Sequence, residues 1–360
     1  MQRLSGLADE MFARGIGSGA AISVGDRGHE VARLWTGFTR RLPIPGAPVG
    51  DSTWFDVASL TKPMATVAIA MVLVGEGALD LESPIQRWIP FATSAGTIRQ
   101  LLGHAAGCAA HVEFFRRLSV GDHPDPRDEL AAMAATEPAN APGTTAVYSD
   151  LGYILLGAIV ERAAGAPLEE AFRTLVADPL GIGARYPGTT TLAGAVATEV
   201  DQRTGVEAVV EGRVHDENAY FGGGVCGHAG LFARIGDVAT FAAAIVDTAN
   251  GIPRGRLRPD VVTRFLTESA APGASWRLGW DTPSSTPGVS HAGDRWPRSG
   301  SAGHLGFTGT SMWLDLARRR WVVLLTNRVH PTRSGASADA IKALRRAVND
   351  TALELLDASR

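Results

Sequence analysis

The sequence has little cysteine, no long apolar run and almost no net charge. Its two cysteines, Cys108 and Cys226, can form at most one bridge, so no disulfide framework carries the fold. No run approaches the roughly 18 consecutive apolar residues that a membrane-spanning helix needs. A net charge of −3 gives no electrostatic reason to expect a nucleic-acid or membrane partner. These absences indicate a soluble globular protein, and 360 residues predict two domains or one large one.

The N-terminal segment lacks the features of a secretion signal. Asp9 and Glu10 interrupt its apolar stretch before it reaches the length of a signal-peptide core. We therefore expect a cytoplasmic location for the chain as it stands, and a periplasmic or secreted one if its start is truncated. The oligomeric state stays open.

Strand patterns occupy both ends of the chain. Residues 19–24 and 31–38 carry β-branched and aromatic side chains on either side of a turn, which predicts a hairpin after a short amphipathic helix. Residues 311–314 and 321–326 predict a second strand pair, because the run WVVLL is typical of a buried strand. From Ser337 onward, apolar residues recur every three or four positions, which predicts a closing helix.

The middle of the chain has alanine-rich helical patterns separated by Gly/Pro loops. These stretches cover residues 64–74, 152–164, 168–176 and 238–246. Strands at both ends favour an α/β (α+β) fold, in which an antiparallel sheet built from both chain ends is flanked by terminal helices, with a mostly helical domain inserted. We expect an α/β domain of residues 1–75 plus 272–360, a mostly helical domain of residues 76–271, and an active site in the cleft between them.

The sharpest local motif is Ser59-Leu60-Thr61-Lys62-Pro63. Proline is tolerated in the first turn of a helix, so Pro63 predicts a helix that starts at about Ser59. Residues three apart share a helix face, which brings the Lys62 ammonium group within reach of the Ser59 hydroxyl. A lysine can take a serine proton when burial or another cation lowers its pKa, whereas arginine never releases its proton. Only two of the 34 basic residues are lysine, which favours a nucleophile beside its base; an ordinary helix cap at Ser59 is the alternative.

Two further segments contain residues that could take part in chemistry. Tyr148 lies at a loop-to-helix junction, where a nearby cation would favour its phenolate and make it a proton acceptor. A packing tyrosine is the alternative. Residues 303–310 read GHLGFTGT before a predicted strand, and such glycines let a backbone approach a ligand and hold a developing oxyanion. A glycine-rich turn into a hairpin is the alternative there.

Together the three motifs, S-x-x-K, Y-S-[N/D] and H-x-G in that order, resemble those of class C β-lactamases and related penicillin-binding-protein-like serine hydrolases, a family that includes carboxylesterases and D-aminopeptidases. The resemblance runs through nearly the whole chain. It includes FDVASLTKP, LLGHAAG, YSDLGYILLG, VHDENAYFGGGVCGHAGLF, LGWD, GHLGFTGTSMWLD and LLTNRVHPTR. It implies the β-lactamase/DD-peptidase fold and a serine hydrolase without a metal or cofactor.

The resemblance also implies roles for individual residues. Ser59 would be the acylated nucleophile, Lys62 its proton partner and Tyr148 the second member of the proton relay. The backbone N–H groups of Ser59 and Phe307 would form the oxyanion hole.

Asp150, His304 and Gly306 would contribute to substrate binding, and two of them depart from the family pattern. Asp150 stands where many relatives carry asparagine, so a group that would bind a substrate amide is an anion or a protonated acid. His304 stands where class C β-lactamases carry the lysine that engages the β-lactam carboxylate. Both changes remove affinity for anionic substrates and favour neutral esters or amides. Because an ordinary histidine has a pKa of about 6.5, we expect this preference to narrow as the pH falls.

Other kinds of site are weaker alternatives. A zinc ion could in principle be held by His104, Cys108, His111, Cys226 and His228. The resemblance instead makes LLGHAAG and GHAGLF structural turns. A G-x-G-x-x-A pattern at Gly15 mimics a dinucleotide loop but precedes a strand rather than following one. The polar segment 214–218 has no assigned role.

The predicted function is a serine hydrolase that forms an acyl-enzyme on Ser59, with small neutral carboxylic esters as the first substrate class. A D-Ala peptidase and a weak β-lactamase are alternatives. A catalytically idle binding or assembly module is the alternative from another class, and the retention of Ser59, Lys62 and Tyr148 opposes it. The expected partner is a small ester, amide or β-lactam.

Overall fold

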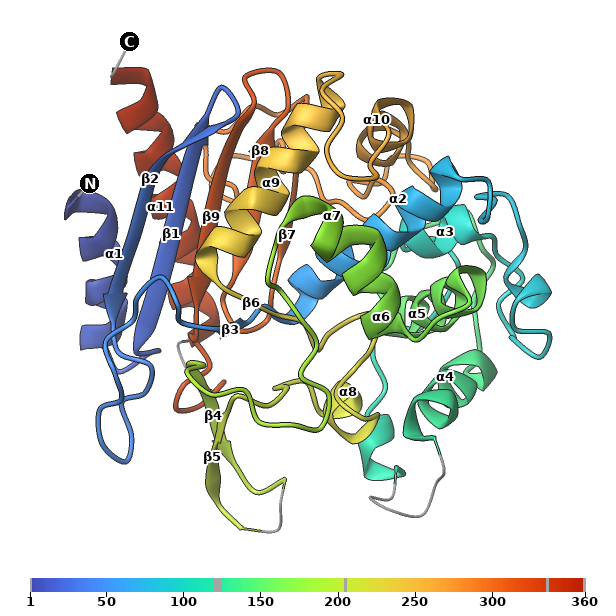
Figure 1. Cartoon of the computed structure of the whole chain (residues 1–360), viewed down its shortest axis with the longest axis horizontal. Helices are drawn as coiled ribbons and strands as arrows, with labels where there is room; N and C mark the ends of the chain where they lie inside the picture. The colour runs from blue at the N-terminus through green and yellow to red at the C-terminus, as the bar shows by residue number, and fades with distance from the viewer. Residues whose placement is uncertain (1, 119–124, 204–205, 335–336, 359–360) are drawn as a thin grey trace.

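A five-stranded sheet forms the centre of the computed structural model, which describes residues 2–118, 125–203, 206–334 and 337–358 (Figure 1). The strand order is β2-β1-β9-β8-β7, and every neighbouring pair is antiparallel. The strands are β1 (Gly19–Asp26), β2 (His29–Gly37), β7 (Ser301–Leu305), β8 (Ser311–Asp315) and β9 (Arg320–Thr326). The sheet is therefore built from both chain ends, as the sequence predicts.

Helices cover both faces of the sheet. The terminal helices α1 (Gln2–Ala13) and α11 (Ser337–Ala358) pack against each other and against one face, and α9 (Ile235–Ala249) packs across the other (Figure 1). Successive side chains of a strand point to opposite faces, so Leu324 joins the core under α1 and α11 while Leu325 joins the core that includes α9. The expected α/β architecture with flanking terminal helices is confirmed.

The other helices gather beside the sheet, on the right in Figure 1. The main ones are the π-helical segment Lys62–Val67 with its continuation α2 (Ala68–Gly75), α3 (Ile98–Leu102), α4 (Pro126–Thr136), α5 (Asp150–Ala164), α6 (Leu168–Phe172), α7 (Asp178–Leu180), α8 (Glu217–Phe221) and α10 (Pro259–Thr267). The predicted helical stretches all fall in helices, with residues 173–176 in the π-helical segment Arg173–Ala177 that follows α6. The predicted domain limits stay a prediction, and α9, from within the range assigned to the helical domain, packs against the sheet.

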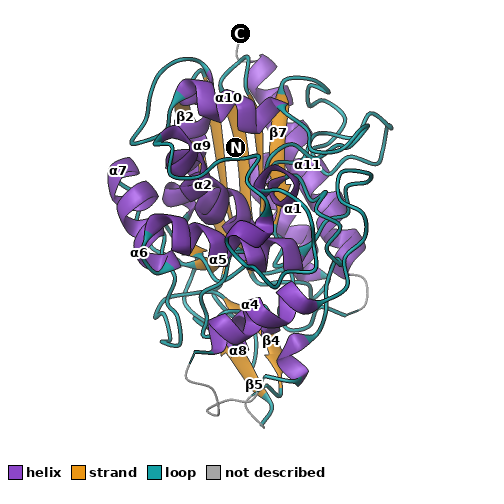
Figure 2. Ribbon diagram, turned by 90° about the vertical axis from the view of Figure 1, so that its right-hand side faces the viewer, coloured by secondary structure: helices purple, strands orange, loops and turns teal. Residues whose placement is uncertain are grey.

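Two small strand pairs were not predicted. β3 (Phe55–Asp56) pairs with β6 (Phe232–Ala233), next to the Ser59 motif. β4 (Ala197–Asp201) pairs with β5 (Ala208–Glu211) at the bottom of Figure 2, with an irregular register. Strands this short leave no alternating pattern long enough to recognise in the sequence.

One stretch among the described residues, Ala58–Gly75, is long and apolar enough to cross a membrane by length and composition. However, 83% of it is buried inside the protein, as in a core helix. The same burial places the start of this helix, and the Ser59 motif with it, against the centre of the molecule.

Candidate active site

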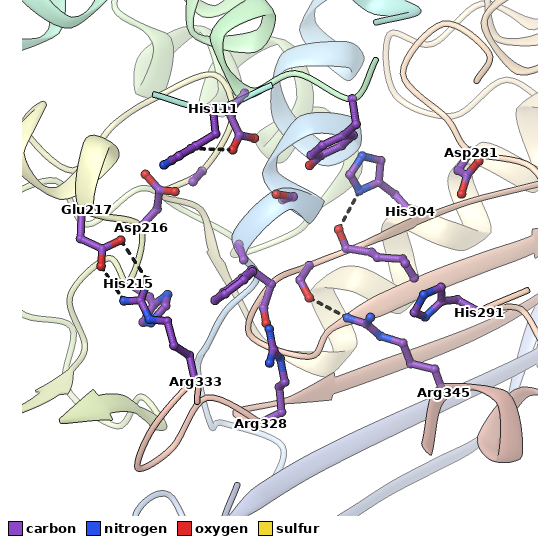
Figure 3. Close-up of a pocket in the computed structure, with 18 of the residues that line it drawn as sticks. His111, His215, Asp216, Glu217, Asp281, His291, His304, Arg328, Arg333 and Arg345 are labelled. Atoms are coloured by element: carbon purple, nitrogen blue, oxygen red, sulfur yellow. Dashed lines mark hydrogen bonds and ion pairs between the residues drawn. The ribbon is translucent and has the colours of Figure 1, made fainter. Parts of the chain in front are cut away.

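A pocket of about 540 Å³ brings together the three sequence motifs (Figure 3). Its walls come from the segment before Lys62–Val67, the start of α5, the region of α8, and β7 with the loop that follows it. The predicted site residues that line it are Ser59, Tyr148, Asp150, His304, Gly306 and Phe307. Lys62 lies beneath the pocket wall with a fully buried side chain.

The Lys62 ammonium group contacts most of the other polar groups around Ser59. Its Nζ donates to Ser59 Oγ at 3.1 Å, to Tyr148 Oη at 2.7 Å and to Asp150 Oδ1 at 2.7 Å. The carbonyl oxygen of His228 lies 3.3 Å away. The buried Lys62 nitrogen thus contacts both the predicted nucleophile, Ser59, and the other predicted relay residue, Tyr148.

The local backbone conformation places Ser59 next to the Lys62 ammonium group. Ser59 lies in the 3₁₀ turn Ala58–Leu60, and Pro63 is the second residue of the helical segment that follows. Ala58 has a left-handed φ of +48°, a strained conformation for a residue with a Cβ, and its N–H donates to Asp56 Oδ1 at 2.8 Å. The cap positions of the 3₁₀ turn and of the helical segment are held by Val57 and Thr61, so Ser59 occupies neither of them. The helix-cap alternative for Ser59 is therefore wrong.

Close helix packing brings the His228 carbonyl to Lys62. Gly157 in α5 lies against Gly227, where a Cβ on Gly157 would sit 2.9 Å from the Gly227 backbone. The Thr66 hydroxyl, one helical turn beyond Lys62, donates to the Gly227 carbonyl oxygen at 2.7 Å. Two adjacent carbonyls of the 227–228 segment thus face the Lys62 helix.

The charge state of Lys62 differs from the one expected. Burial alone lowers the pKa of the Lys62 ammonium group, but the Asp150 carboxylate and Tyr148 raise it above its ordinary value. Burial likewise raises the pKa of the Asp150 carboxyl, but Lys62 and His111 hold it well below its usual range. Asp150 is therefore an anion and Lys62 a cation. The lowered pKa that a lysine base requires is not present, because a carboxylate lies 2.7 Å from the nitrogen.

Tyr148 is held by an aromatic cluster. Its ring centroid lies 4.7 Å from that of His104 and 5.3 Å from that of Trp276. Burial raises the pKa of the Tyr148 phenol, while Lys62 opposes that rise. The hydroxyl is directed to the Lys62 nitrogen, so Tyr148 is more than a packing residue. Trp276 was not singled out in the sequence, where the LGWD motif begins only two residues later.

His304 is neutral over the ordinary pH range. Burial and the nearby Lys62 lower its pKa to about 3. Its Nδ1 lies 2.9 Å from the carbonyl oxygen of Leu305, which can only accept, so Nδ1 carries the proton. Nε2 is buried and has no partner among the described residues. The expectation that His304 gains charge near pH 6 is therefore wrong, because the buried ring cannot be solvated as a cation.

Hydrogen bonds fasten the loop after β7 to the segment that precedes Ser59. The Thr308 hydroxyl donates to the Asp56 carbonyl oxygen at 2.8 Å, and the Thr310 hydroxyl donates to that of Val57 at 3.0 Å. These bonds fix Phe307 relative to the Ser59 turn. The oxyanion hole of the Ser59 and Phe307 N–H groups stays a prediction.

Two buried arginines line the basic side of the pocket (Figure 3). Arg328 Nε donates to the Phe307 carbonyl oxygen at 2.8 Å, and Arg345 donates to three carbonyl oxygens of the same loop. Within the described ranges neither forms an ion pair with an acid, unlike Arg333, which pairs with Glu199 and Glu217. Burial and the charge of Arg328 lower the pKa of Arg345 to about 9. The sequence contained Arg328 in the motif LLTNRVHPTR without indicating its role.

Residues 215–217 of the polar segment 214–218 line the pocket, and Asp216 lies close enough to Asp150 for the two carboxyl groups to interact. The His215 ring stacks on Phe307, with centroids 5.8 Å apart. Asp216 Oδ1 lies 2.9 Å from His228 Nε2, and Glu217 pairs with Arg333. The segment therefore shapes the pocket and carries two acidic groups on its rim.

The residues of the zinc alternative have other partners. His104 joins the Tyr148 cluster, His111 Nδ1 lies 3.4 Å from Asp150 Oδ2, and His228 Nδ1 lies 3.1 Å from Cys226 Sγ. In the part of the chain that the structure describes, no group of three or more His, Cys, Asp or Glu side chains is arranged to hold a metal ion.

The sequence and the fold are similar to those of known proteins. The family model described as Beta-lactamase matches residues 7–347. A proposed D-alanyl-D-alanine carboxypeptidase of Escherichia coli (strain K12) is 30% identical over 311 residues, which cover 77% of this chain and 70% of that protein. An N-acetylmuramyl-L-alanine amidase of Bacillus subtilis (strain 168) is 29% identical over 357 residues, which cover 89% of this chain and 80% of that one. Among solved structures, EstCE1, a hydrolase with promiscuous acyltransferase activity, has the same fold, with a TM-score of 0.71 at 22% identity over 97% of this chain and 98% of that one.

Proposed function

The chain belongs to the beta-lactamase family of serine hydrolases, and we propose that it hydrolyses small neutral carboxylic esters through an acyl-enzyme on Ser59. One observation carries this proposal. Lys62 Nζ lies within hydrogen-bond distance of both Ser59 Oγ and Tyr148 Oη, at 3.1 and 2.7 Å. A serine hydroxyl is a weak nucleophile until a neighbouring group takes its proton, and these contacts supply that neighbour.

The reaction follows from the placement of these groups. Ser59 Oγ attacks the ester carbonyl carbon, a new C–O bond forms, and the hydroxyl proton enters the Tyr148–Lys62 pair. The N–H groups of Ser59 and Phe307 hold the oxyanion that develops. The proton then passes to the leaving alcohol as the ester C–O bond breaks. Water repeats the sequence on the acyl-enzyme and releases the carboxylic acid.

The preference for neutral esters rests on the charges around the nucleophile. His304 is neutral, so β7 offers no fixed cation to an anionic substrate beside Ser59. Asp150, which lines the same pocket, is an anion. A carboxylate placed between these two residues would lose its hydration and gain no opposite charge.

Covalent labelling tests the nucleophile. A fluorophosphonate should add to Ser59 alone, as read by intact mass and peptide mapping. Ser59→Ala should abolish labelling and lower ester hydrolysis by roughly three orders of magnitude or more, whereas the exposed Ser285→Ala should change neither. Labelling at another serine would overturn the assignment. A folded protein that neither labels nor hydrolyses any substrate would favour the idle binding module.

A second candidate is hydrolysis of an amide that carries a carboxylate, including D-alanyl peptides, N-acetylmuramyl-L-alanine and β-lactams. Arg328 and Arg345 support it, because they are buried, line the pocket and have no acidic partner among the described residues. Two adjacent unpaired cations repel each other, and a substrate anion would relieve that repulsion. The names of the Escherichia coli and Bacillus subtilis relatives point to the same amide class.

A substrate panel separates the two candidates. We would compare kcat/KM for p-nitrophenyl butyrate, nitrocefin, D-alanyl-D-alanine and N-acetylmuramyl-L-alanine at pH 8. A preference for the neutral ester supports the first proposal. If an anionic amide is preferred, Arg328→Gln should lower its kcat/KM by about tenfold or more while sparing the neutral ester. Arg318→Gln, whose half-exposed side chain pairs with Asp315, is the matched control.

A further inference from the structure

Asp150 has a charge that the Ser59 mechanism does not by itself require. It is the first residue of α5, where the Ser149 hydroxyl caps the helix by accepting the Gly152 N–H at 3.0 Å. The Asp150 N–H donates to the Ala110 carbonyl oxygen at 2.8 Å. Both contacts fix the backbone, and the helix N-terminus favours a negative side chain at this position. The carboxylate is therefore built into the site.

The two oxygens of Asp150 face different environments. Oδ1 lies 2.7 Å from the fully buried Lys62 nitrogen. Oδ2 lies 3.4 Å from Nδ1 of His111, a half-exposed residue at the pocket wall. The other titratable groups that interact with Asp150 or Lys62 are His228, Asp216, Tyr148, His104 and His304. The last two are neutral because burial lowers their pKa values, so Asp150 is the anion in contact with Lys62.

The geometry decides which member of the Lys62–Tyr148 pair gives up a proton first. If Lys62 lost its proton, Asp150 would remain as a buried anion without a cation in contact with Oδ1. If Tyr148 lost its proton, its phenolate would lie 2.7 Å from an ammonium ion that Asp150 also stabilises. The second state keeps Asp150 Oδ1 and the phenolate oxygen in contact with the Lys62 cation, whereas the first leaves Asp150 Oδ1 without a cation.

From these contacts we propose that Asp150 is a positioning residue that keeps Lys62 as a permanent ammonium ion and thereby makes Tyr148 the group that accepts the Ser59 proton. The inference rests on the proposed acyl-enzyme function. Tyr148 first loses its proton to solvent hydroxide. The Ser59 O–H bond then breaks, the Ser59 Oγ–acyl bond forms, and the proton bonds to the Tyr148 oxygen. Lys62 keeps its three protons throughout.

The scarcity of lysine makes a direct test feasible. The chain has two lysines, Lys62 and Lys342, so Lys342→Arg leaves Lys62 as the only one. In that background, lysine labelled with ¹³C at Cε gives a single side-chain signal whose shift reports the Lys62 protonation state. We expect no deprotonation of Lys62 up to the ordinary lysine value of about 10.4. Deprotonation clearly below this value with Asp150 in place would overturn the proposal.

Asp150→Asn tests the cause, since asparagine keeps the size and the Oδ1 acceptor but removes the charge. The Lys62 titration midpoint should fall by about one to three pH units. Asp281→Asn removes a carboxyl that lines the same pocket without contacting Lys62, and should leave the midpoint unchanged. An unchanged midpoint in Asp150→Asn would also overturn the proposal.

The kinetic consequence can be measured on the same variants. The acid limb of kcat/KM against pH should shift to lower pH in Asp150→Asn and stay in place in Asp281→Asn. If NMR shows that Lys62 stays protonated with Asp150 in place, but the acid limb does not shift in Asp150→Asn, the role of Tyr148 as proton acceptor is refuted. The NMR result needs no substrate, so failure of the proposed ester hydrolysis can be told apart from failure of the charge assignment.

Discussion

Arg345 donates from Nη2 to the carbonyl oxygen of Gly306 at 2.6 Å, which joins helix α11 to the loop beside the nucleophile. The same guanidinium donates to the carbonyl oxygens of Gly309 and Thr310. A cation that binds three carbonyls of one short loop restricts the directions in which the N–H groups of that loop can point. The geometry of the predicted oxyanion hole therefore depends on a helix on the far side of the sheet.

Arg345→Lys should lower kcat for the preferred substrate by roughly ten- to a hundredfold with little change in KM. Lysine keeps the charge but cannot reach three carbonyls in fixed directions, so the loss falls on transition-state stabilisation. Steady-state kinetics and the affinity for a boronic acid, which mimics the tetrahedral state, should change together. Arg346→Lys, on the same helix but paired with Asp294, is the control. A change in KM alone would contradict this role.

The selectivity between neutral and anionic substrates should not change between pH 8 and pH 6 on account of His304. With a pKa of about 3, the His304 ring is neutral at both values. We therefore expect the ratio of kcat/KM for p-nitrophenyl butyrate to that for nitrocefin to depend on pH in the same way in wild type and in His304→Gln. The absolute value of the ratio can differ between the two proteins. A ratio that narrows at pH 6 in wild type but not in the variant would show that His304 is protonated.

His304 should also make the fold sensitive to acid. In the unfolded chain a histidine takes up a proton below a pKa of about 6.5, whereas folded His304 does so only near 3. The unfolded state thus binds more protons between these values, and stability is lost as the pH falls through this window, by up to about 1.4 kcal/mol per pH unit. Thermal unfolding from pH 7.5 to 5 should show a shallower slope for His304→Gln.

Two helical glycines offer a matched test of packing. At Gly157, a Cβ would come within 2.9 Å of the Gly227 backbone, whereas at Gly6 nothing lies within 4 Å. Gly157→Ala should reduce the free energy of unfolding by about 1 to 3 kcal/mol, and Gly6→Ala should increase it by about 0.5 to 1 kcal/mol. Urea unfolding measures both. If both substitutions change the free energy of unfolding equally, the backbone around Gly157 and Gly227 can move to accept a Cβ without loss of stability.

The parts of the fold and site that could be predicted depend on short-range patterns. Pro63 marks the start of a helix because of its own ring, and the spacing of Ser59 and Lys62 follows from helix geometry. Strand β9 can be predicted because a short apolar run rich in β-branched residues is typical of a buried strand. Each of these inferences uses residues within a few positions of each other.

The parts that could not be predicted depend on contacts between distant residues. Asp150 lies 88 positions after Lys62, and their 2.7 Å contact, together with Tyr148, reverses the expected direction of the lysine pKa. Arg345 lies 39 positions after Gly306, in a helix whose pattern indicates only an amphipathic surface. The sequence suggests an ordinary pKa for His304, because burial, the main cause that lowers it, is not visible in a sequence.

The position of β9 has a consequence for synthesis on the ribosome. This strand separates β1 from β8, yet it is made 294 residues after the end of β1, counting from Asp26 to Arg320. At roughly 5 to 20 residues per second, β1 waits about 15 to 60 seconds for its central partner. Until β9 is made, any β1–β2 hairpin that has formed lacks the strand that pairs with the other edge of β1. A chaperone that shields strand edges during translation would therefore act on this hairpin before any other part of the sheet.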